Sequence, residues 1–125
     1  MAGVAVVIPA YNEERTVASV VEAVKASGLA DEVIVVSDGS TDATAEVARS
    51  HGARVVELPR NAGKGGAIAA GLRLTDAGVV AFLDADLVGL RGHHVADLIR
   101  PVAAGRADMA VGVFLRGRLA PDLAQ

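Results

Sequence analysis

The sequence predicts an α/β fold: a mostly parallel sheet of about five strands with helices on both faces. Short, continuous apolar runs alternate along the chain with longer amphipathic stretches. Continuous apolar runs are typical of strands buried on both faces of a parallel sheet, and the longer stretches suit the crossover helices that join such strands. Polar, glycine-rich segments follow the apolar runs, so we expect these loops to gather at one edge of the sheet.

Each expected element follows from a local pattern. The apolar runs predict strands over residues 4–8, 32–37, 54–58, 79–83 and 109–115. Apolar residues at helical spacing predict the helices between them. For the first two helices the expected boundaries are Asn12 to Gly28, and Ser40 or Thr41 to about Gly52. The third helix is expected to follow the glycine-rich loop 60–66, and the fourth to kink or end at Pro101.

The composition fits this fold and excludes several functions. Hydrophobic residues make up 52% of the 125 residues, which is enough for one core. The net charge of −3, without a basic block, argues against nucleic-acid binding, and the absence of cysteine excludes disulfides and thiolate chemistry. No apolar run approaches a membrane span, and the N-terminus lacks a signal-peptide pattern. We therefore expect a cytoplasmic protein, free or peripheral to a membrane.

The strongest chemical signal is a pair of carboxylates, Asp84 and Asp86, at the C-terminal end of the strand over residues 79–83. Two carboxylates about 5 Å apart repel by roughly 3 kcal/mol at an effective dielectric constant near 20, so a site that keeps both ionised favours a cation. Oxygen ligands of this kind suit Mg²⁺ or Mn²⁺. The alternative is a solvated turn, in which the Asp side chains bond to nearby backbone groups.

Three further loops are expected at the same edge: residues 9–13, 38–40 and 61–66. The glycine-rich loop 61–66 opens onto a helix, where backbone N–H groups and the helix dipole favour a phosphate. Lys64, one of only two lysines, adds a positive charge there. Tight turns without a ligand remain the alternative for these glycines, and Asp38 can equally form a turn.

Four segments in this order, IPAYNEE, VVSDGSTDAT, NAGKGGAIAAG and FLDADL, resemble family 2 glycosyltransferases with the GT-A fold. The chain is similar to the branches that include dolichyl-phosphate mannosyltransferase and glucosyl-3-phosphoglycerate synthase, over about residues 4–113. The resemblance implies a Rossmann-like nucleotide-binding half. It also implies transfer of a sugar from a UDP- or GDP-linked donor to an acceptor such as a polyprenyl phosphate or a small phosphorylated acid.

The resemblance also assigns roles to residues. It implies that Asp84 and Asp86 hold Mg²⁺ or Mn²⁺ on the diphosphate, that Asp38 accepts a hydrogen bond from the base, and that Lys64 approaches the donor. The nucleotide-sugar site that it implies comprises Pro9, Ala10, Tyr11, Glu13, Asp38, Lys64, Gly65, Asp84, Ala85 and Asp86.

The chain also departs from the family pattern. Members are usually longer, so we expect residues 1–125 to be a single nucleotide-sugar-binding domain without the C-terminal acceptor half. The catalytic base is then unidentified, and we expect binding with little transfer. Apolar residues 111–115 are expected to promote self-association. His93 and His94 are potential metal ligands, although histidines at a helix start more often face solvent; Arg116 and Arg118 belong either to a phosphate site or to a solvated tail.

Two other functions stay open at this point. Asp84-Ala85-Asp86-Leu87-Val88 fits the D-x-D-x-[TV] pattern of haloacid-dehalogenase-like phosphatases, with Asp84 as nucleophile, but no lysine follows Asp86 as that family requires. The second alternative is a nucleotide-binding module without catalytic activity. A nucleotide-binding test separates the transferase from the phosphatase, and a turnover test separates an enzyme from a binding module.

Overall fold

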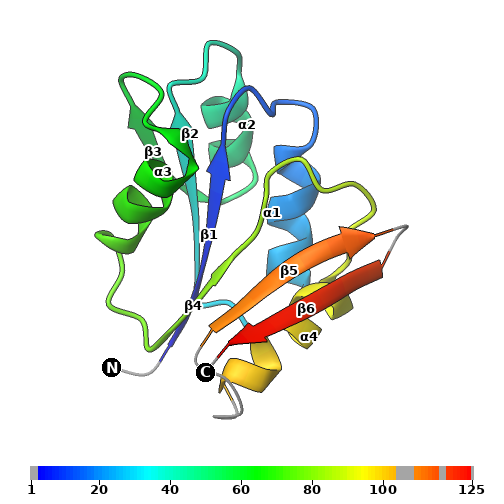
Figure 1. The fold of residues 1–125 in the computed structure, drawn as a ribbon. Helices are drawn as coiled ribbons and strands as arrows, with labels where there is room; N and C mark the ends of the chain where they lie inside the picture. The colour runs from blue at the N-terminus through cyan, green and yellow to red at the C-terminus, as the bar shows by residue number, and fades with distance from the viewer. Residues whose placement is uncertain (1–2, 104–108, 116–117, 125) are drawn as a thin grey trace.

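A computed structural model describes residues 3–103, 109–115 and 118–124, and shows one six-stranded sheet with helices on both faces (Figure 1). The strands lie in the order β3-β2-β1-β4-β5-β6. Their bounds are β1 Val4–Ala10, β2 Glu32–Asp38, β3 Arg54–Leu58, β4 Val79–Phe82, β5 Met109–Leu115 and β6 Arg118–Ala124. The helices are α1 Val17–Ala26, α2 Thr44–Ser50, α3 Gly63–Leu72 and α4 Gly92–Ala103.

The first five strands are parallel, which confirms the predicted fold class. Strand β1 lies between β2 and β4. Its successive side chains point to opposite faces of the sheet and so enter two different cores. Val6 and Ile8 pack with the apolar stripes of α1, α2 and α4, whereas Val7 packs with α3 on the opposite face. Burial on both faces explains why the strand sequence is continuously apolar.

Helix α3 lies close to the sheet because it presents a glycine to the strands. A Cβ atom at Gly71 would lie 2.5 Å from Val7 Cγ1, which is closer than real contacts allow, and 3.3 Å from Val36 Cγ2, which is tighter than most. Figure 1 shows α3 apart from the other three helices. This close packing places the last turn of α3 directly on β1 and β2.

The sixth strand was not predicted. β6 pairs antiparallel with β5, from Met109 opposite Ala124 to Leu115 opposite Arg118. Its sequence, RLAPDLA, has no β-branched residue and contains Pro121, so propensity gives no strand signal. Proline is tolerated because β6 is at the edge of the sheet. Strand β5 is therefore paired on both sides, and the side chains of residues 111–115 lie outside the described part.

Several predicted helix boundaries were wrong. Helix α1 begins after Thr16 and not at Asn12, which has a φ of +52° and whose Oδ1 accepts a hydrogen bond from Thr41 N at 2.8 Å. Helix α2 begins at Thr44, whose N–H donates to Asp42 Oδ1 at 3.0 Å. In both cases, the expected capping side chain instead lies in a loop that precedes the helix.

The start of α3 also differs from expectation, and of the two outcomes expected for α4 at Pro101, an end of the helix is wrong. Helix α3 begins at Gly63, so Gly65 and Gly66 are helical and are not part of the preceding loop. Helix α4 continues through Pro101 to Ala103 and does not end at the proline. Within the described residues, no helix has the length and apolar character that a membrane span needs.

Candidate nucleotide-sugar site

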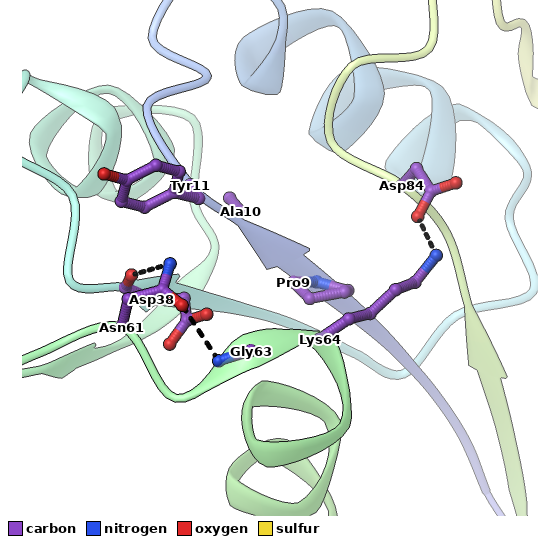
Figure 2. A pocket seen from close by; sticks show the side chains of 8 residues that line it. All are labelled: Pro9, Ala10, Tyr11, Asp38, Asn61, Gly63, Lys64 and Asp84. Atoms are coloured by element: carbon purple, nitrogen blue, oxygen red, sulfur yellow. Dashed lines mark hydrogen bonds and ion pairs between the residues drawn. The ribbon is translucent and has the colours of Figure 1, made fainter.

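A pocket of about 300 Å³ opens at the C-terminal edge of the sheet, which is the size of a small ligand site (Figure 2). Parallel strands end at the same edge, so the segments that follow β1, β2, β3 and β4 meet there. The pocket is lined by Pro9, Ala10, Tyr11, Asp38, Asn61, Gly63, Lys64 and Asp84. Six of these residues belong to the predicted site, namely Pro9, Ala10, Tyr11, Asp38, Lys64 and Asp84.

Asp38 shapes the loop that closes one side of the pocket. Its side chain is only 4% exposed, and its Oδ1 accepts a hydrogen bond from Ala62 N at 2.7 Å. The Asp38 carbonyl oxygen accepts from Asn61 Nδ2 at 3.3 Å, and Asn61 Oδ1 accepts from Gly63 N at 3.0 Å. The turn interpretation of Asp38 is thus correct in part, because the carboxylate holds residues 61–63 in place beside the pocket.

The residue after Asp38 must be a glycine. Gly39 has a φ of +73°, and a Cβ atom there would lie 2.6 Å from Asn61 N and 2.8 Å from the Arg60 carbonyl carbon. Both contacts are to backbone, which cannot move aside easily. The close approach of the two loops therefore depends on the missing side chain.

Asp84 and Asp86 are turned outward by the burial of their neighbours. Leu83 and Ala85 are each 2% exposed, so the side chains between and after them face the pocket edge or solvent. Asp84 Oδ1 lies 2.6 Å from Lys64 Nζ, and both side chains are largely exposed, at 47% and 65%. Asp84 is thus paired with an ammonium group, and the carboxylate oxygens of Asp84 and Asp86 are the kind of ligand that Mg²⁺ and Mn²⁺ prefer.

A third carboxylate lies close to the pair. Burial, followed by the negative charge of Asp86, raises the pKa of Glu13 above its usual value, and Asp84 adds to this effect. Thr16 connects the two segments, because its hydroxyl donates to Ala85 O at 2.7 Å and lies 3.4 Å from Glu13 Oε2. The start of α1 therefore supports the loop that carries Asp84 and Asp86.

Four predicted site residues do not line the pocket: Glu13, Gly65, Ala85 and Asp86. Glu13 lies beside the carboxylates, Gly65 is exposed in the first turn of α3, and the Ala85 side chain is in the core. Asp86 is exposed and is not among the residues that line the pocket. Their roles stay predictions, and the Ala85 backbone carbonyl already accepts a hydrogen bond from the Thr16 hydroxyl.

Sequence reasoning named the loop 61–66 but did not select Asn61 or Gly63 as site residues. Both line the pocket, and both take part in the hydrogen bonds around Asp38. The available signal was the Asn-x-Gly spacing, because an Asn side chain often accepts from the backbone N–H two residues later. That local bond is the one observed.

The paired histidines form a helix start. His94 is 8% exposed, contrary to the expectation that both rings face solvent, and its Nδ1 accepts from Arg91 N at 2.9 Å. The His93 and His94 ring centroids are 4.1 Å apart. In the described part of the chain, no three His, Asp or Glu side chains form a ready metal site. Arg116 lies outside that part, and Arg118 is the first residue of β6.

The family model described as glycosyl transferase family 2 matches residues 5–123. The chain belongs to this family. Glucosyl-3-phosphoglycerate synthase from Mycobacterium tuberculosis is 38% identical over 122 residues, which cover 90% of this chain and 38% of the relative. The synthase from Mycolicibacterium smegmatis is 43% identical over 108 residues, 79% of this chain and 36% of the relative. A phosphatase of the dehalogenase type is therefore not supported.

Solved structures of the M. tuberculosis synthase match the GT-A-like arrangement. Its complex with UDP has a TM-score of 0.80 at 37% identity, and covers 94% of this chain and 46% of that one. A complex with Mn²⁺, UDP-glucose and phosphoglyceric acid has a TM-score of 0.74 at 39% identity, and the match covers 83% of this chain and 40% of the synthase chain. Another contains Mg²⁺ and UDP. The chain spans less than half the length of these relatives.

Proposed function

We propose that residues 1–125 form the nucleotide-sugar-binding domain of a glycosyltransferase that uses UDP-glucose, Mn²⁺ or Mg²⁺, and a small phosphorylated acid as acceptor. The observation that supports this most is the joining of Asp38, Lys64 and Asp84, from three separate segments, around one pocket. The M. tuberculosis synthase, to which this chain is similar in sequence and fold, has been solved with UDP-glucose, phosphoglyceric acid and Mn²⁺.

The pocket divides into two chemical regions. Pro9, Ala10 and Tyr11 present an apolar wall at the end of β1, and Asp38 supplies a carboxylate beside it, which suits a nucleoside with a hydrogen-bond donor on its base. On the other side, the first turn of α3 and Lys64 offer N–H groups and a positive charge to a diphosphate. We assign the nucleoside to the first region and the diphosphate to the second.

Asp84 and Asp86 would hold the metal, with the remaining ligands supplied by the diphosphate and water. When bound, the metal neutralises charge on the departing diphosphate. The protein residues bind and orient the donor, and we assign no catalytic base. A phosphorylated acid and a nucleotide sugar are both water-soluble, which supports the cytoplasm as the place of reaction; a polyprenyl phosphate acceptor has no specific support.

A thermal-shift panel tests this function. UDP, GDP and their sugar conjugates are compared with Mn²⁺ and with EDTA. We expect UDP and UDP-glucose to raise the melting temperature more with Mn²⁺ than with EDTA, since a ligand at 100 times its dissociation constant stabilises by about 2.7 kcal/mol. The Asp86→Asn variant should lose the part of the nucleotide-induced shift in melting temperature that depends on Mn²⁺. Equal shifts with EDTA, or no shift with any nucleotide, would contradict the proposal.

A further inference from the structure

The feature that invites a further inference is the ion pair between Lys64 and Asp84. The two residues come from different elements, Lys64 from the first turn of α3 and Asp84 from the loop after β4. Figure 2 shows the Lys64 side chain reaching toward the Asp84 carboxylate. The Lys64 Nζ lies 2.6 Å from Asp84 Oδ1. The ammonium group therefore lies on a carboxylate oxygen that the proposed function assigns to a metal.

We propose that Lys64 is an internal counter-ion that competes with the metal for Asp84, and that it moves to the diphosphate when metal and nucleotide bind together. This inference rests on the proposed function. It adds that metal binding and nucleotide binding depend on each other through one side chain. Lys64 then favours the metal–nucleotide complex over the metal alone.

The charges at the site support an exchange of partners. Glu13, Asp84 and Asp86 form an acidic group, and Lys64 is the one cation that the described ion pairs place on it. The ammonium nitrogen lies 2.6 Å from Asp84 Oδ1. A divalent cation bound to the same carboxylate would repel this ammonium group, so the two cations compete for Asp84. A diphosphate lying along the pocket brings negative charge close to the displaced ammonium, which then gains a new partner.

The mobility of Lys64 makes the exchange possible. Its side chain is 65% exposed, and an ion pair with this exposure is weak enough to break without disturbing the fold. Lysine has a flexible stem and a compact charge, so its Nζ can pivot while α3 stays in place. Lys64 also lines the same pocket as Asp38 and Tyr11, where the nucleotide is assigned. Both proposed partners of Lys64 therefore border one cavity.

Binding of Mn²⁺, followed by the EPR signal of the free ion, tests the inference without measuring activity. Titrations are made with and without UDP for the wild type, Asp86→Asn, Lys64→Met and Lys25→Met. Lys25 is the matched control because it is the only other lysine, is half exposed, and pairs with Glu22 at 3.7 Å outside the pocket. Methionine keeps an unbranched side chain and removes the charge in both variants.

We expect Lys64→Met to bind Mn²⁺ several-fold more tightly than the wild type when UDP is absent, because the competing ammonium is gone. We also expect UDP to enhance Mn²⁺ affinity less in Lys64→Met, and by linkage Mn²⁺ to enhance UDP affinity less by the same factor. Lys25→Met should match the wild type in both titrations.

Two results would overturn the inference. One is unchanged or weaker Mn²⁺ affinity of Lys64→Met without UDP, and the other is an equal gain in Lys25→Met, which would indicate a net-charge effect. Failure of the proposed function looks different: UDP would then not enhance Mn²⁺ affinity in the wild type at all, and Asp86→Asn would change nothing. The two failures are therefore distinguishable in one set of titrations.

Discussion

At the scale of single residues, Asp38 combines two roles that one substitution can separate. In the wild type, Ala62 N donates to Asp38 Oδ1 at 2.7 Å. Asparagine at this position keeps the Oδ1 acceptor but removes the negative charge that would face a base. We expect Asp38→Asn to change the free energy of unfolding by less than about 1 kcal/mol and to weaken UDP binding by about 1.5 kcal/mol or more.

Calorimetry of UDP binding and urea denaturation measure these two effects. Asp38→Ala is the companion variant, and it should lose both binding and stability because the Ala62 N–H loses its partner. If Asp38→Asn binds UDP like the wild type, then Asp38 only supports the loop.

Glu13 is expected to make stability depend on pH. Its pKa is raised in the folded state above the usual 4.5, by burial and by Asp86, so the folded protein holds this proton more tightly than the unfolded chain does. The stability associated with the protonated group is present below about pH 4.5 and is lost as the pH rises through the raised pKa. Glu13→Gln removes this loss.

Denaturation curves of the wild type and Glu13→Gln at about pH 4 and pH 7 test this expectation. The variant should gain stability relative to the wild type at the higher pH, and the difference should shrink at the lower pH. A variant that loses more stability at pH 7 than at pH 4 would show that the ionised Glu13 is stabilised in the fold.

At the scale of elements, the junction of the β2 and β3 loops depends on Gly39. Gly39→Ala introduces a Cβ atom at 2.6 Å from Asn61 N in a backbone conformation with positive φ. We expect a loss of about 1–3 kcal/mol in the free energy of unfolding and weaker UDP binding, because residues 61–63 must shift.

Gly65→Ala is the matched control for this glycine. Nothing lies within 4 Å of its Cβ position, and it is helical, so alanine should be neutral or stabilise α3 by up to about 1 kcal/mol. Thermal melts of both variants give the comparison. Equal effects at the two positions would contradict the close-approach argument.

The elements also show what the sequence can and cannot predict. The five parallel strands were predictable because burial on both faces leaves a continuous apolar run, as in β1 and β2. The helix starts were not, because Asn12 and Ser40 bond across to each other's loop, and such contacts between distant segments have no local signature. β6 was missed because it forms by pairing with β5 and not by propensity.

The site residues, like the elements, were predictable where the signal is local and were not predictable where it depends on contacts between distant segments. Asp84 and Lys64 were selected from their positions after a strand and in a glycine-rich loop, and the structure brings them into contact. The hydrogen bond from the Thr16 hydroxyl to Ala85 O joins residues 69 positions apart, and only the folded chain reveals it.

At the scale of the whole molecule, the two faces of the sheet are covered unequally. Helices α1, α2 and α4 pack on one face, whereas α3 packs on β1, β2 and β3 of the other. Among the described residues, the second face near β4 keeps Val80 and Phe82 only partly buried. We expect self-association through this half of the sheet, and light scattering that finds a monomer at all concentrations would contradict it.

The central claim is that Asp84 and Asp86 hold a metal that binds the diphosphate of a nucleotide in the pocket beside Asp38. Anomalous diffraction at the manganese edge, from crystals grown with UDP and Mn²⁺, tests it most directly. We predict one manganese peak within coordination distance of both carboxylates and of the UDP phosphates, with the base beside Asp38. A manganese peak elsewhere, or UDP bound in the pocket with no metal on Asp84 and Asp86, would contradict the claim.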